Sequence, residues 1–171
     1  MELPKRKPNR LKNYDYSSNG AYFITFCTHE RKQTLCRIVG AIHESPEVIL
    51  TSWGQIVDQT IHLLPNRFGI KIDAYAVMPN HVHLLILVEN PDNLRAIHES
   101  PLQNRSVISK AIGYLKMRTS KQIHCTGVTE PIWQRSFHDH IIRSSKDYEK
   151  IFDYVRLNPQ LWLDDCYFSM E

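Results

Sequence analysis

The chain has 171 residues, of which 42% are hydrophobic and 23% are charged. These values are typical of one globular domain, and they exclude wholesale disorder and a collagen-like repeat. The apolar run Leu84–Val88 is far shorter than the ~20 residues of a membrane helix, and no apolar stretch follows the basic first residues. We therefore expect a cytoplasmic protein with no membrane partner, whose four cysteines are free thiols.

Positive charge is concentrated at the start of the chain. Five of the 21 basic residues and one of the 18 acidic residues lie within residues 1–12, so this segment carries +4 and the rest −1. Such an arm indicates a polyanionic partner, because bases that meet phosphates release counterions, although a solvated tail has the same composition. We expect a basic arm over 1–20, a domain over 21–163 and a tail over 164–171. The bases of the arm are Lys5, Arg6, Lys7, Arg10 and Lys12.

Strand-like and helical patterns alternate along the chain. The residue patterns predict a strand over 22–26, a helix from Thr51 or Ser52 to about Pro65, and two strands over 70–78 and 81–88 joined by a Pro-Asn turn. A helix over 106–122, a strand over 132–143 and a helix from Ser144 or Ser145 to 157 follow. This order predicts an α+β fold: a ferredoxin-like, RRM-like antiparallel sheet with helices on one face, plus a C-terminal helix.

The hexapeptide Ala-Ile-His-Glu-Ser-Pro occurs twice, at 41–46 and at 96–101. Both copies lie between predicted elements, where insertions are tolerated, and nothing around them repeats. We hypothesise that they are coding remnants of one repetitive DNA element that was inserted twice. Their histidines are therefore poor candidates for chemistry.

Two histidine pairs have the spacing of metal ligands. His81 and His83 open a predicted strand, where alternate side chains share a face, so both imidazoles point to the same side. A rigid pair of this kind forms half of a divalent metal site, although an isolated pair is more often an ordinary core or surface feature. His138 and His140 flank an aspartate and rank lower as ligands. We expect His140 to support the site or to contact a phosphate.

The last predicted helix carries polar residues beside its apolar stripe. Tyr154 and Asn158 are neighbours one turn apart, and Lys150 lies one turn before Tyr154. This row fits an attacking phenol beside a metal ligand, although an amphipathic surface tyrosine has the same spacing. A phenol with a pKa near ~10 needs a nearby cation or metal to favour the phenolate. Tyr148 is the next tyrosine to consider.

Basic residues also gather on the helix predicted over 106–122, which contains no acid. Four bases without a counter-charge indicate a face that meets phosphates. They are Lys110, Lys116, Arg118 and Lys121, and Arg135 is a further candidate in the segment that follows.

Three ordered motifs closely resemble one family. They are MPNHVHLL at 78–85, IWQRSF at 132–137 and DYVRLNP at 153–159. The sequence resembles the single-tyrosine HUH transposases of the insertion-sequence 200-like kind, and within them most closely the REP-associated tyrosine transposases, which are linked to repetitive extragenic palindromes. The resemblance spans about Ala21 to Leu161.

The resemblance implies a role for each matching residue. His81 and His83 match the two metal-binding histidines, and Tyr154 matches the nucleophile that becomes joined to a DNA 5′-phosphate. Asn158 matches a third metal ligand, for which many members have glutamine. The implied cofactor is Mg²⁺ or Mn²⁺, and the implied partner is single-stranded DNA with a hairpin or palindromic repeat. Relatives act as monomers or as homodimers. The linkage conserves the energy of the phosphodiester, and the chain contains no ATP-binding P-loop motif.

Two other functions remain open on the sequence. A histidine-triad nucleotide hydrolase would need a third histidine where Leu85 stands. A catalytically inactive ferredoxin-like protein that only binds nucleic acid would explain the basic residues but not the three motifs.

Overall fold

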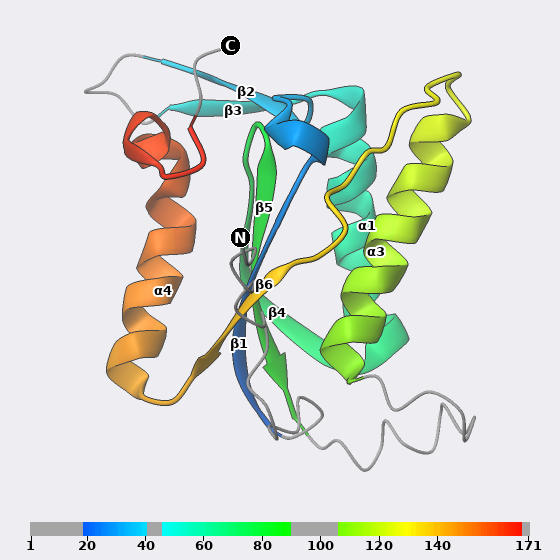
Figure 1. The fold of residues 1–171 in the computed structure, drawn as a ribbon. Coiled ribbons are helices and arrows are strands. Elements are labelled where there is room, and N and C mark those ends of the chain that lie inside the picture. The colour runs from blue at the N-terminus through cyan, green and yellow to red at the C-terminus, as the bar shows by residue number, and fades with distance from the viewer. Residues whose placement is uncertain (1–18, 41–45, 90–105, 169–171) are drawn as a thin grey trace, which may run out of the picture.

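A computed structural model describes residues 19–40, 46–89 and 106–168, and its centre is a four-stranded antiparallel sheet (Figure 1). The strands lie in the order β4-β5-β1-β6. In chain order this is second, third, first and fourth, which is the predicted ferredoxin-like arrangement. The strands are β1 (Gly20–Cys27), β4 (Ile70–Val77), β5 (His81–Val88) and β6 (His138–Ile142).

Helices cover both faces of this sheet. Helices α1 (Ser52–Phe68) and α3 (Val107–His124) lie side by side on one face, as predicted. Helix α4 (Ser145–Leu157) packs against β4 and β5 on the other face, and the short 3₁₀ helix η2 (Asn158–Asp164) continues it. None of the described helices has the length and apolar character needed to cross a membrane.

The alternation of side chains along β1 and β5 gives the two faces different contents. Apolar side chains on one face form the main core with α1 and α3, and Tyr22, Ile24 and Leu84 in it are fully buried. The opposite face carries His81 and His83, and α4 covers it with a smaller apolar cluster. A polar site therefore lies between the sheet and the last helix.

The elements differ from the expected ones in three places. A separate hairpin, β2 (Cys36–Val39) and β3 (Glu47–Leu50), was not predicted, because each strand has only four residues. The strand expected over 132–143 is reduced to β6, and only a single bridge between Thr28 and Trp133 precedes it. Helix α1 continues through Pro65 and ends at Phe68. Gly69 caps it in the left-handed conformation, and the Gly69 N–H donates to the Pro65 carbonyl.

The start of α1 is fixed against the residue that precedes β2. The Thr51 hydroxyl caps the helix by accepting from the N–H of Gly54 at 3.1 Å, and the Thr51 N–H donates to the Leu35 carbonyl at 2.9 Å. A Cβ atom at Gly54 would lie 2.0 Å from that same carbonyl oxygen. Only glycine fits at this contact.

This contact generates a stability prediction. Gly54→Ala should lower the free energy of unfolding by about 2–3 kcal/mol despite the better helix propensity of alanine, because backbone must move to admit the methyl group. Gly113→Ala in α3, where nothing lies within 4 Å of the new Cβ, should raise it by about 0.5–1 kcal/mol. Urea unfolding of both variants measures the difference, and equal effects would contradict the close contact at Gly54.

Candidate active site

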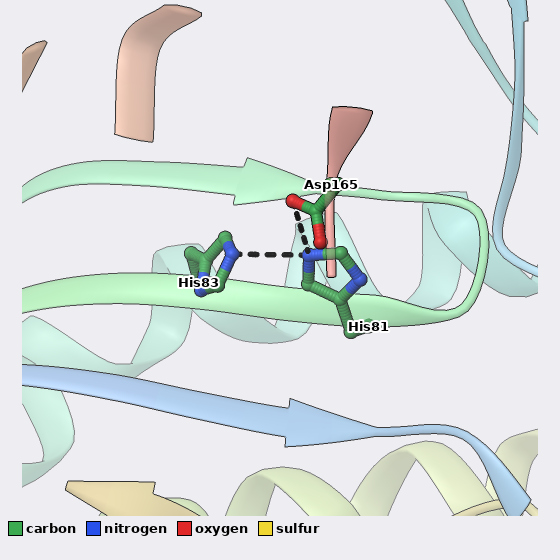
Figure 2. A group of neighbouring side chains, drawn as sticks. All are labelled: His81, His83 and Asp165. Atoms are coloured by element: carbon green, nitrogen blue, oxygen red, sulfur yellow. Dashed lines mark hydrogen bonds and ion pairs between the residues drawn. The ribbon is translucent and has the colours of Figure 1, made fainter. Parts of the chain in front are cut away.

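Two histidines of β5 form the centre of the candidate site. His81 and His83 are 0% and 1% exposed, and their Nε2 atoms lie 3.0 Å apart (Figure 2). The Nδ1 atom of His81 lies 2.9 Å from the side-chain oxygen of Asn80, and that of His83 lies 2.7 Å from the hydroxyl of Thr25. These contacts orient both rings and leave both Nε2 atoms directed at one point, as in a preorganised metal site.

Burial also sets the protonation of the pair. Removal from water is the main cause that lowers the pKa of both His81 and His83 to about 3, and the nearby Arg31 charge contributes to this shift at His81. Both imidazoles are therefore neutral at physiological pH. A neutral imidazole offers a lone pair to a metal, whereas a protonated one does not.

A carboxylate that the sequence analysis did not single out completes this group. The Oδ2 atom of Asp165 lies 4.0 Å from Nε2 of His81, and the ligand atoms of the two histidines and Asp165 all lie within 4.8 Å of one another (Figure 2). The backbone N–H of Tyr167 donates to the other carboxylate oxygen at 2.7 Å. The sequence places Asp165 in the tail expected over 164–171, and its only signal there is the adjacent acidic pair Asp164-Asp165.

Helix α4 brings the predicted tyrosine and asparagine to the same place. The Tyr154 hydroxyl donates to Oδ2 of Asp165 at 3.4 Å, and the Tyr154 and His83 ring centroids are 5.4 Å apart. The Asn158 amide N–H donates to the same Oδ2 at 2.9 Å. Burial and the Asp165 charge raise the pKa of Tyr154 to about 12, so the phenol is protonated in this arrangement.

The donor set fits a divalent cation. Oδ1 of Asn158 is buried and has no hydrogen-bond partner among the described residues, which is costly unless another group satisfies it. The possible ligands are two neutral imidazoles, a carboxylate and an amide oxygen. Mn²⁺ accepts both nitrogen and oxygen ligands, and the two oxygen ligands also suit Mg²⁺. His81, His83, Asp165 and Asn158 are therefore the residues that could hold the ion.

The remaining supporting residues lie at greater remove from this centre. His140 is on β6 opposite Phe23, and the Phe23 ring stacks on that of His83. The Nε2 atom of His140 lies 3.0 Å from the carboxylate of Asp147. Lys150 is exposed on α4. Tyr148, the alternative nucleophile, donates its hydroxyl to Asp73 of β4 instead of to the Asp165 carboxylate.

The predicted DNA-contacting residues differ in their surroundings. Lys116 is engaged within the fold: its ammonium donates to the carbonyls of Gln134 and Ser136 at 2.9 and 2.7 Å, and burial lowers its pKa to about 8. The segment that it holds carries the exposed Arg135. Lys121 is exposed, and Lys110 and Arg118 are partly buried on α3. The predicted bases Lys5, Arg6, Lys7, Arg10 and Lys12 lie outside the described residues, as do both hexapeptides apart from Pro46.

Comparison with known proteins gives one consistent family. Residues 17–158 match the family described as "Transposase IS200 like". An uncharacterized protein of Haemophilus influenzae is 32% identical over 176 residues, covering 94% of this chain and 91% of the relative. A REP-associated tyrosine transposase of Escherichia coli is 25% identical over 147 residues, covering 84% of this chain and 68% of the relative.

A solved structure shares the fold. It is that of a REP-associated tyrosine transposase bound to a REP hairpin. The TM-score is 0.60 at 21% sequence identity, and the match covers 93% of this chain and 75% of that chain.

The donor set predicts stabilisation by metal. Mn²⁺ at about one hundred times its dissociation constant should stabilise the protein by about 2.7 kcal/mol, because the ion binds the folded site and not the unfolded chain. Thermal unfolding with and without Mn²⁺ measures this. His81→Ala should abolish the shift and Asn158→Ala should reduce it, whereas His62→Ala, an exposed histidine of α1, should leave it intact. An unchanged shift in His81→Ala would place the ion elsewhere.

Proposed function

The chain belongs to the IS200-like transposase family, and from this we propose that it cleaves and rejoins single-stranded DNA at hairpin elements through a 5′-phosphotyrosine intermediate. The observation that carries the proposal is the convergence of the Tyr154 phenol with two buried, neutral imidazoles and the Asp165 carboxylate. A nucleophile, a proton acceptor and metal-ligating atoms thus lie together in one place, as phosphoryl transfer requires.

The proposed reaction exchanges one phosphodiester for another. The Tyr154 oxygen attacks phosphorus in line, a Tyr–O–P bond forms and the bond from phosphorus to the 3′ oxygen breaks. The phenol proton passes to Asp165, whose carboxylate already accepts it as a hydrogen bond, and the departing 3′ oxygen takes a proton from water. Reversal of the same steps with another 3′ hydroxyl rejoins DNA without ATP.

A divalent cation is the proposed cofactor of this site. When bound, Mg²⁺ or Mn²⁺ would neutralise phosphate charge and favour the phenolate and the leaving oxygen. His81 and His83 would hold the ion with Asp165 and Asn158, and Thr25 and Asn80 keep the imidazole rings in position.

The DNA strand would be held by basic residues outside this centre. Arg135, Lys110 and Lys121 remain our candidates because their side chains are exposed or partly exposed. We also propose that Arg118 and the basic residues at 5–12 contact the DNA strand. Lys116 is better explained as the residue that fixes the segment carrying Arg135, because both of its recorded hydrogen bonds go to that segment's carbonyls.

The alternatives have less support. In a histidine-triad hydrolase the third histidine would replace Leu85, which here is fully buried. A protein that only binds DNA would have no need for a tyrosine hydroxyl against a carboxylate beside paired imidazoles.

Loss of the Tyr154 hydroxyl should separate catalysis from binding. Incubation with a labelled single-stranded hairpin and Mn²⁺ should give an adduct that survives denaturing electrophoresis. Tyr154→Phe should reduce its formation by about 10³-fold or more, with near-normal binding, because only the nucleophilic oxygen is removed.

Tyr148→Phe is the matched control, since it removes a hydroxyl from the same helix and should retain the adduct. Adduct formation by Tyr154→Phe but not by Tyr148→Phe would reassign the nucleophile. Binding without any adduct in the wild-type protein would favour the DNA-binding alternative.

A further inference from the structure

The codons of the repeated hexapeptide can form a self-complementary DNA sequence, which the proposed function does not explain. Mirrored about the histidine codon, the first codon bases pair: G of Ala with C of Pro, A of Ile with T of Ser, and C of His with G of Glu. The amino acids fix the first bases of five of these codons, and serine permits T. All three pairs are complementary.

The remaining codon positions complete the symmetry. Each second base faces a third base, and every required third base is allowed by the genetic code: GCG ATT CAT GAA TCG CCC. The residues before the two copies, Gly40 and Arg95, differ, yet both have G as the second codon base and permit G as the third. Both copies are therefore compatible with the same perfect palindrome, GGGCGATTCATGAATCGCCC.

The fold explains why the first copy of the hexapeptide is tolerated where it stands in the chain. The first copy begins directly after Gly40 and ends at Pro46, and a Cβ on Gly40 would lie only 3.2 Å from Cα of Pro46. Val39 and Glu47 on either side are paired partners in the β2–β3 hairpin. The chain thus leaves and returns at one point, so residues gained there need not shift the strands.

The second copy also lies between fixed ends. Strand β5 ends at Val88, which is paired with Gly20 and Ile70, and α3 begins at Val107 with Ser106 as its cap. Neither copy interrupts the elements that carry His81, His83 or Tyr154.

We propose that both hexapeptides are coding copies of one palindromic DNA element, and that this palindrome, folded as a hairpin with CATG as its loop, is the DNA that this protein binds. The inference rests on the proposed function, which requires hairpin DNA. Because a palindrome reads identically on both strands, insertion in either orientation gives the same hexapeptide in this frame.

The first experiment needs no enzyme activity. Sequencing the gene across codons 40–46 and 95–101 should show the palindrome in both places. Synonymous codons that destroy self-complementarity in both copies, such as AGC for serine, would overturn the proposal.

The second experiment measures binding of the full chain to three single-stranded oligonucleotides. The hairpin GGGCGATTCATGAATCGCCC within its natural flanks should bind about tenfold or more tightly than two controls. One control encodes the same peptide with synonymous codons that cannot pair, and the other has a scrambled stem of equal stability. Equal binding to all three would overturn the substrate assignment. Adducts formed with another hairpin but not with this one would do the same while leaving the proposed function intact.

A strained turn after the end of β1 supports a second inference. Glu30 and Arg31 are the two non-glycine residues with positive φ in the described chain, at 54° and 58°. Each such residue costs about 1–2 kcal/mol. Hydrogen bonds of Thr28 to the carbonyls of Lys32 and Asn80 hold this turn beside the turn that leads into His81.

The strained turn places a cation beside the site. The Arg31 guanidinium lies 5.2 Å from the centre of the Tyr167 ring, and that ring lies 4.6 Å from the His81 ring. Arg31 forms no ion pair with a carboxylate among the described residues, whereas Lys32 beside it pairs with Glu130. We infer that Arg31 binds a phosphate of the DNA strand seated at this site.

Relief of strain distinguishes this role from a structural one. Arg31→Gly and Glu30→Gly both suit positive φ, so neither should lower the unfolding temperature. Only Arg31→Gly should weaken single-stranded DNA binding, by about tenfold or more, and reduce the slope of log affinity against log salt by about 0.7. An unchanged slope in Arg31→Gly would overturn the inference, whereas absence of DNA binding by the wild-type protein would overturn the proposed function itself.

Discussion

The site depends on keeping two imidazoles buried and neutral with their Nε2 atoms 3.0 Å apart. Two bare nitrogen lone pairs at this distance repel each other, so one ring carries a proton between them or a cation replaces it. The sheet makes the close approach unavoidable, because alternate residues of β5 share a face and hydrogen bonds with the Thr25 hydroxyl and the Asn80 side-chain oxygen fix the rings. The strand thus holds two neutral nitrogen ligands in a fixed position beside each other.

Helix α4 brings further polar side chains to the two histidines because it covers the second face of the sheet. Val155 packs into the smaller core, and one helical row beside it carries Tyr154 and Asn158 toward Asp165. The same carboxylate oxygen accepts from the phenol and from the amide. Asp165 therefore connects the proposed nucleophile to the proposed metal ligands, and a change in its charge would affect both.

The elements that sequence predicted well are those whose signals are local. The histidine pair, the caps at Thr51 and Ser144 and the row on α4 follow from periodicity and from residue types within one turn or strand. Asp165 escaped prediction because it follows η2 and reaches His81 of β5 only through a long-range contact, which has no periodic signal in the sequence. Lys116 had the pattern of an exposed base, but its ammonium binds carbonyls of the distant segment around Gln134, a contact without a local signal.

The protein sequence shows in which reading frame the proposed palindrome is translated. Of the three frames of GGGCGATTCATGAATCGCCC, one contains the stop codon TGA and cannot persist inside a gene. Another encodes Gly-Arg-Phe-Met-Asn-Arg, which would add phenylalanine and methionine to a connection between two elements. The third encodes the observed hexapeptide, whose polar residues and terminal proline are typical of sequences that connect elements. Two copies in that one frame are therefore what selection for a folded product would leave, whichever strand received the element.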